Sequence, residues 1–150
     1  MADLRLEELS AKTIAAANAL TLKPGQEQYL APVSYSAAAA VSDPRTAWQR
    51  VVLDGDAVVG FIEGCFDPDA DSEAFRSILW RINVDADDQG RGIGRFAVAA
   101  LADEARGRGF DALYVIWEQG EGGPESFFLR TGFTPQGETV YGEVIGKLAL

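Results

Sequence analysis

The 150-residue sequence predicts a single domain, residues 1–150, of the α/β (α+β) class with a mixed, mostly antiparallel sheet. Two observations predict it. Three apolar runs between residues 48 and 84 follow one another through short polar segments, as antiparallel strands in a meander do. Residues 78–84 then lead through a glycine-rich turn into an amphipathic segment and a further apolar run at 110–117. A strand, a helix and a strand in this order form a parallel pair with a right-handed crossover.

The N-terminal third predicts one strand and two helices. Apolar and charged residues alternate at positions 4–7, which is typical of a short, half-buried strand. A helix is expected from Ser10, its N-cap, through Leu20, and a proline-glycine pair follows it. Residues 35–41 predict a second short helix that ends before Asp43-Pro44.

The centre of the chain predicts the meander itself. Residues 48–53 and 57–66 are apolar runs separated by Asp54-Gly55-Asp56, a strong hairpin signal. Residues 67–71 form a polar loop, and residues 75–84 return as the third antiparallel strand.

The C-terminal half predicts two more helices and two more strands. An amphipathic helix begins near Arg95 and ends at Gly107 and Gly109, before the strand at 110–117. Pro124 and Gly132 delimit a short helix, because proline suits the first turn and glycine the end. Residues 138–150 give a last strand or hairpin.

Composition limits the classes of partner. The net charge of −10 and the pI near 4.4 argue against nucleic acid and anionic membrane, which both require a basic face. This charge suits a cationic or neutral small partner, or simply a soluble acidic surface. The absence of histidine and the single Cys65, expected in the core, remove the usual zinc ligands, so no metal is expected. Without a signal peptide or membrane span, a cytoplasmic location is expected.

The turn at residues 89–94 has the properties of an anion site. Its glycines at 90, 92 and 94 precede a helix whose first backbone N–H groups have no intrahelical partner. Glycine also tolerates positive φ, which lets successive N–H groups converge on one point. Arg91 and Arg95 add positive charge at the rim. The alternative is a glycine-rich turn that only links a strand to a helix.

Spacing distinguishes among phosphate-binding loops. No lysine follows the turn as in a Walker loop, and the glycines lie two apart, unlike those of the dinucleotide fingerprint. What remains is Gln89, two residues, Gly92, one residue and Gly94. This pattern resembles the acetyl-CoA pyrophosphate loop of the GCN5-related N-acetyltransferase (GNAT) superfamily.

The resemblance extends over nearly the whole chain, in the order of its elements and in the RTGF sequence at residues 130–133. It implies a sheet whose central parallel strands splay around the acetyl-CoA site, with helices on both faces. The ending at residues 132–150 is similar to the last hairpin of bacterial diamine and spermidine acetyltransferase-like members. Residues 26–36 resemble their substrate-side segment.

By this resemblance, the strand that precedes the turn binds the pantetheine arm through its backbone, and the turn binds the pyrophosphate. The cofactor-binding residues are therefore expected to be Ile82, Asn83, Val84, Gln89, Gly90, Arg91, Gly92, Ile93, Gly94 and Arg95.

Family members transfer the acetyl group by direct attack of an amine on the thioester. Most place a tyrosine four residues before the glycine of the GF pair, where it protonates the leaving thiolate. This sequence departs from the pattern, because that position is Phe128. Water, Tyr114 or Tyr141 is then left to supply the proton, or turnover is slow.

A base must take a proton from an alkyl ammonium, whose pKa lies near 10. Glu63 on a central strand and Glu118 at the end of the parallel strand are the candidates. They could equally be ordinary surface carboxylates or anchor a substrate ammonium. Tyr29, Tyr35 and Trp80 are expected on the substrate side, where cation–π contacts would suit a cation.

The function predicted is that of an acetyl-CoA-dependent N-acetyltransferase acting on a primary amine of a small, cationic molecule similar to a diamine or polyamine. One alternative is acetylation of a protein or peptide amine. Another, suggested by Phe128, is a catalytically weak CoA-binding sensor. By analogy with the family, a homodimer is expected.

Overall fold

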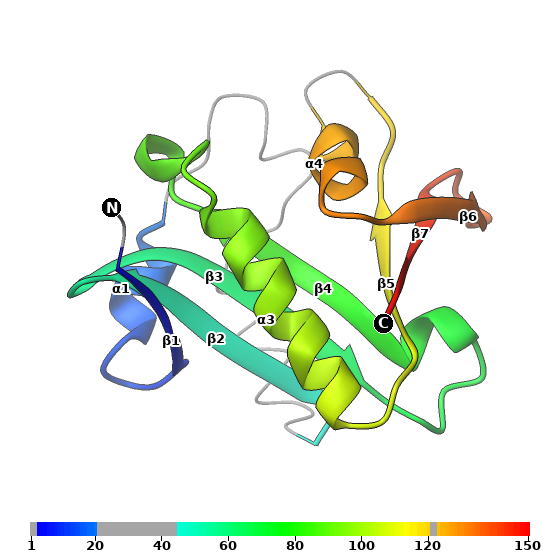
Figure 1. Ribbon diagram of the computed structural model, residues 1–150, viewed down its shortest axis with the longest axis horizontal. Helices are drawn as coiled ribbons and strands as arrows, with labels where there is room; N and C mark the ends of the chain where they lie inside the picture. Colours follow the sequence, from blue (N-terminus) through cyan, green and yellow to red (C-terminus); the bar gives the residue numbers. More distant parts are fainter. Residues whose placement is uncertain (1–2, 21–44, 121–122) are drawn as a thin grey trace.

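The computed structural model describes residues 3–20, 45–120 and 123–150. Its strands form one seven-stranded sheet in the order β1-β2-β3-β4-β5-β7-β6 (Figure 1). The strands are β1 Leu4–Glu8, β2 Ala47–Asp54, β3 Ala57–Phe66, β4 Ser77–Val84, β5 Ala112–Trp117, β6 Thr134–Glu138 and β7 Val144–Ala149. The helices are α1 Ile14–Asn18, α3 Ile93–Gly107 and α4 Glu125–Arg130, with short 3-10 turns at Glu73–Phe75 and Ala86–Asp88.

The first four strands form an antiparallel meander, as the sequence predicts. β2 and β3 are joined by a tight turn in which Gly55 has a φ of 61°, a left-handed conformation that favours glycine. β3 pairs with β4 along nearly its whole length, from Gly60 opposite Val84 to Phe66 opposite Ser77. This confirms the hairpin and the third strand.

β4 and β5 form the parallel pair, but only over a short stretch. Ile78 pairs with Tyr114 and Leu79 with Val115, and no later residues of the two strands are paired. The register against β3 explains where the separation begins. Glu63 lies opposite Arg81 and Gly64 opposite Leu79, so Trp80 is an extra, bulged residue in β4. Beyond this bulge the two strands leave an opening between them.

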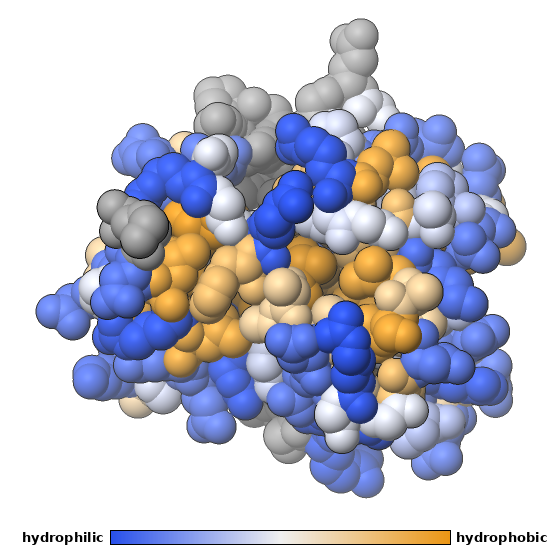
Figure 2. Space-filling view, in the orientation of Figure 1, coloured by the Kyte–Doolittle hydropathy of each residue, from blue (hydrophilic) through white to orange (hydrophobic). Residues whose placement is uncertain are grey.

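Helices cover both faces of the sheet, as predicted (Figure 1). α3 packs across β3, β4 and β5, and its buried side places Leu101 against Gly64, where an added Cβ would lie 2.4 Å from Leu101 Cδ1. On the other face, Ala17 of α1 packs with Val51 and Phe61. Figure 2 shows apolar residues flanking α3, bordered by hydrophilic ones.

Some boundaries differ from the prediction. α1 spans Ile14–Asn18 and its N-cap is Thr13 instead of the predicted Ser10, because residues 10–13 close a turn of their own in which Thr13 Oγ1 accepts from the Ser10 N–H at 3.0 Å. α3 begins at Ile93, two residues earlier than expected. The predicted helix at 35–41 lies outside the described residues. Among the residues that the structure describes, no helix is long and apolar enough to span a membrane.

Candidate functional site

A cleft of about 490 Å³ lies between the end of β4, the start of α3 and one side of α4. Eight of its lining residues come from the predicted cofactor set, and the others come from α4 and the segments flanking it. The lining residues are Ile82, Val84, Gln89, Gly90, Gly92, Ile93, Gly94, Arg95, Gly123, Pro124, Ser126, Phe127, Phe128, Arg130 and Thr131.

The floor of the cleft is the N-terminus of α3. Gly92 is the N-cap and has a φ of 83°, and no side chain caps the helix. The Phe96 N–H donates to the Gly92 carbonyl at 3.0 Å, which is the first hydrogen bond of the helix. The N–H groups of Ile93, Gly94 and Arg95 therefore have no partner within the helix. No acidic side chain lies in the first turn. The helix therefore presents uncapped donors and a positive dipole end to the cleft.

Side chains fix the glycine-rich turn to the sheet. The Gln89 side-chain amide donates to the Val84 carbonyl at 3.0 Å, which ties the turn to the end of β4. Arg91 donates to Asp88 and, at 2.6 Å, to Asp54 at the end of β2. The hydrogen bond from Arg91 lowers the pKa of Asp54 and raises that of Arg91. Arg91 thus holds the turn against the end of β2, and it does not line the cleft.

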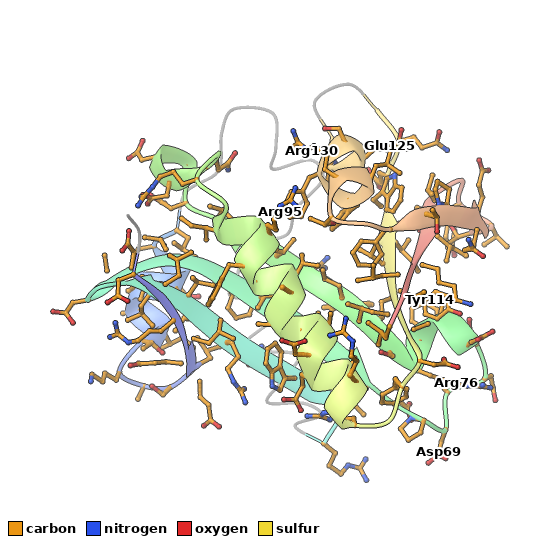
Figure 3. The ribbon with its side chains drawn as sticks, viewed as in Figure 1. Asp69, Arg76, Arg95, Tyr114, Glu125 and Arg130 are labelled. Carbon is orange, nitrogen blue, oxygen red and sulfur yellow. The ribbon has the colours of Figure 1, made fainter. Side chains whose placement is uncertain are left out.

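Two arginines do line the cleft from opposite sides. Arg95 lies on the first turn of α3 and Arg130 on the last turn of α4, and Figure 3 shows them on either side of the gap between the two helices. Within the described part of the chain, neither forms an ion pair, whereas Arg91, Arg106 and Arg108 do. Both positive charges therefore remain available to an anion at the cleft mouth.

Aromatic packing sets the position of α4. The Trp117 indole N–H donates to the Glu125 carboxylate at 3.0 Å, which ties α4 to the end of β5. Phe128 is buried and stacks on Trp117 with ring centroids 5.4 Å apart. Phe127 lies against the start of α3, where a Cβ on Gly94 would lie 2.7 Å from its ring. Gly94 thus permits a close approach of the two helices.

The tyrosines that sequence reasoning offered as proton donors lie elsewhere. Tyr114 is in the paired half of β5, far from Arg95 (Figure 3), and burial, with a smaller effect of the nearby Glu73, raises its pKa. Tyr141 is 87% exposed between β6 and β7. Neither lines the cleft, so the structure does not support either as a substitute for the missing tyrosine. Phe128 itself lines it.

The predicted carboxylates Glu63 and Glu118 and the predicted substrate residue Trp80 do not line the cleft. Glu118 is exposed just after β5, and Trp80 is 40% exposed at the β4 bulge. Glu63 is 1% exposed and shares a face with Phe61, opposite α3. Tyr29 and Tyr35 lie outside the described residues. The roles assigned to these five residues remain predictions.

Of the α4 wall of the cleft, at residues 123–131, sequence reasoning identified only Phe128. Pro124 and Gly132 predicted the helix, but its cleft-facing residues, Ser126, Phe127, Arg130 and Thr131, carry no local signal of a ligand. Asn83 was predicted with the cofactor set and does not line the cleft, because its side chain lies on the opposite face of β4 from Ile82.

Comparison with known proteins agrees with this geometry. The model of the acetyltransferase (GNAT) family matches residues 14–133. No curated protein matches the chain. The fold is similar to that of the ribosomal-protein-S18-alanine N-acetyltransferase from Escherichia coli, with a TM-score of 0.71 and 19% identity over 97% of this chain and 93% of that one.

Two further similar structures were solved with coenzyme A. The PaiA N-acetyltransferase from Thermoplasma acidophilum has a TM-score of 0.74 and 12% identity over 99% of both chains. The N-acetylglutamate synthase from Neisseria gonorrhoeae, solved with coenzyme A and N-acetyl-glutamate, has a TM-score of 0.73 and 18% identity over 100% of this chain and 36% of that one.

Proposed function

Because the chain belongs to the acetyltransferase (GNAT) family, we propose that its cleft binds acetyl-CoA and that the protein transfers the acetyl group to a primary amine of a small molecule. The observation that supports this proposal is the uncapped start of α3, flanked by Arg95 and Arg130, at one end of an apolar cleft.

The diphosphate fits the glycine-rich turn on two grounds. The N–H groups of Ile93, Gly94 and Arg95 point from the start of a helix that no side chain caps, which is the backbone arrangement that binds phosphate. Gly90 and Gly92 have no heavy atom within 4 Å of an added Cβ, so the space beside these two residues is open. Arg130 offers a second cation for the phosphates of the carrier.

The pantetheine arm fits the inner part of the cleft. Ile82, Val84, Ile93 and Phe128 give it apolar walls, and β4 beyond Leu79 has no partner strand on its β5 side. Backbone groups at such an edge bind an extended, amide-containing chain as a neighbouring strand would. The thioester would then lie near the opening between β4 and β5.

For acetyl transfer, the amine must attack in its neutral form and the thiolate of the carrier must leave. The amine nitrogen forms a bond to the acetyl carbon, the carbon–sulfur bond breaks, and the amine gives up one proton while the thiolate gains one. Phe128 has no proton to give. A thiol has an ordinary pKa near 8.5, so the thiolate leaves and takes a proton from water, and the proton that the amine gives up neutralises the resulting hydroxide.

For the acceptor, we propose a small, cationic amine of the diamine or polyamine type. The net charge of −10 attracts cations, and the ending at residues 132–150 supports this class by its resemblance to such acetyltransferases. A single domain, a cytoplasmic location and a homodimer remain predictions of the same kind.

Two measurements test the function. Isothermal titration with acetyl-CoA is expected to show one site per chain, weakened by Arg95→Ala or Arg130→Ala. Arg106→Ala is the matched control, because Arg106 is an exposed α3 arginine that pairs with Asp103 outside the cleft.

A thiol-release assay with putrescine, spermidine and an N-terminal-alanine peptide is expected to show turnover with one of the small amines. Absence of acetyl-CoA binding at millimolar concentration would refute the proposal.

Phe128 favours a second candidate function, a CoA-binding sensor with little catalysis. Its ring is buried against Trp117 and Phe133, so it completes the core where most family members place a proton donor. A sensor would bind acetyl-CoA in the titration and release no thiol with any amine of the panel. The two assays together therefore distinguish a sensor from an enzyme.

A further inference from the structure

β4 presents different residues to the two sides of the opening beside β5. Ile82 belongs to the core beneath α3 and lines the cleft, as does Val84. Side chains alternate along a strand, so Arg81 and Asn83 face the other side. The register agrees, since Asn83 lies opposite Phe61, which packs with α1 on the far face. The opening therefore has an apolar side toward the cleft and a polar side away from it.

Asn83 is buried without a hydrogen-bond partner for its side-chain oxygen. It is 3% exposed, and its Oδ1 atom has no partner among the described residues. A buried polar atom without a partner destabilises the folded protein, and such atoms are rare in proteins. Asn83 stands between Ile82 and Val84, which both line the cleft, so an unpaired acceptor at this position is best explained by a donor that arrives with a ligand.

The direction of attack identifies that donor. If the thioester lies against Ile82 and Val84, the space on its cleft side is taken by the pantetheine arm and by α4. The amine then approaches from the face where Asn83 and Arg81 lie. A neutral primary amine has two N–H groups and one lone pair. One N–H can bond to a carbonyl oxygen while the lone pair points to the acetyl carbon.

We propose that Asn83 binds and orients the acceptor amine, with its Oδ1 accepting one amine N–H. This inference rests on the proposed function and deepens it. Arg81, two residues away on the same face, has a fixed positive charge that disfavours the protonated amine and so favours the form that reacts. Glu63, opposite Arg81 on β3, lies on the same face and remains the predicted proton acceptor.

The test compares Asn83→Leu with Asn83→Asp. Leucine has a similar size and removes the acceptor, whereas aspartate keeps an oxygen at the same position. Because Oδ1 has no hydrogen-bond partner among the residues that the structure describes, Asn83→Leu should fold with an unchanged or higher Tm. Ser77→Ala is the matched control. Ser77 is also on β4 and 2% exposed, and its hydroxyl has no partner within the described ranges, but it lies at the closed end opposite Phe66.

The assay uses whichever of putrescine, spermidine and the alanine peptide the wild type acetylates fastest. The expected result is a loss of kcat/KM for that amine without a loss of acetyl-CoA affinity. Asn83→Leu should lower kcat/KM for that amine at least tenfold and leave the Kd for acetyl-CoA within twofold. Asn83→Asp should recover part of the loss, and Ser77→Ala should change kcat/KM less than twofold. Unchanged kcat/KM in Asn83→Leu would overturn the inference, as would a parallel loss of acetyl-CoA affinity. Failure of the wild type to bind acetyl-CoA would instead refute the proposed function.

Discussion

Gly92 fixes the direction of the donors at the start of α3. Its φ of 83° lies in the left-handed region, where an alanine costs roughly 1–2 kcal/mol. Gly92→Ala should therefore lower the Tm by several degrees. The backbone of the variant should relax away from this conformation and turn the N–H groups, which should weaken acetyl-CoA binding about tenfold or more. Calorimetry and isothermal titration measure the two effects.

Gly109 provides the control, since its φ is 91°, an added Cβ there meets no atom within 4 Å, and it does not line the cleft. Gly109→Ala should cause a similar fall in Tm with no change in acetyl-CoA affinity. Equal losses of affinity in both variants would show that the backbone of Gly92 has no specific part in binding.

Phe128 is predicted to leave the thiolate without a proton donor from the protein at this position. Phe128→Tyr introduces a hydroxyl into a ring that already lines the cleft, and a positioned proton donor contributes roughly 10²–10⁴-fold in favourable cases. We expect thiol release at saturating amine to rise about tenfold, measured spectrophotometrically. Phe133→Tyr, an edge-on neighbour of Phe128 that does not line the cleft, should give no increase. No change in Phe128→Tyr would mean that thiolate departure is not limiting.

Arg91 should affect stability in acid. Its hydrogen bond lowers the pKa of Asp54, so the folded state binds a proton less readily at Asp54 than the unfolded state does. The stabilisation from this group is therefore present above the unfolded-state pKa and is lost as the pH falls through the folded-state pKa, below about pH 4. Arg91→Ala should flatten the fall in Tm between pH 5 and 3.

The measurement for this prediction is the Tm as a function of pH. Arg106→Ala again serves as the control, because the pKa shift of Asp54 does not involve Arg106. If the Tm of Arg91→Ala falls with pH as steeply as that of the wild type, the Arg91–Asp54 pair does not stabilise the folded protein in the way described.

At the scale of elements, the contact between α3 and α4 sets the width of the cleft. A Cβ at Gly94 would lie 2.7 and 2.9 Å from two ring atoms of Phe127, so Gly94→Ala overpacks this contact at a cost of about 1–3 kcal/mol. Removing the ring in Phe127→Ala should relieve the strain. Chemical denaturation of the single and double variants is expected to give a coupling energy of about 1 kcal/mol or more. Additive effects would show that the two helices do not contact each other through this pair.

Local pattern explains which elements the sequence could predict. The hairpin around Gly55 and the strand, turn and helix around Gly92 follow from apolar runs and glycine positions within a few residues of one another. The position of Arg91 could not be predicted in the same way. Its partner Asp54 is 37 positions away in the sequence, and only the folded sheet brings the two together.

At the scale of the whole molecule, the site depends on one departure from regular pairing. The pairing of β4 with β5 ends at Leu79, next to the bulge at Trp80, and beyond it the side chains of β4 alternate between the cleft side and the opposite side. A bulge has no signature in the apolar run at 78–84, and the α4 wall is built from residues some 40 positions later. The sequence therefore predicted the glycine-rich turn and Phe128, but the rest of the opposing wall and the face that carries Asn83 required the structure.

The central claim is that backbone donors at the start of α3 bind the diphosphate of the acetyl carrier. A crystal structure of the protein with coenzyme A tests it most directly. We predict diphosphate oxygens within 3.2 Å of the backbone nitrogens of residues in the 90–95 turn, and the thiol at the opening between β4 and β5. A diphosphate bound elsewhere, or a turn whose N–H groups point away from it, would contradict the account.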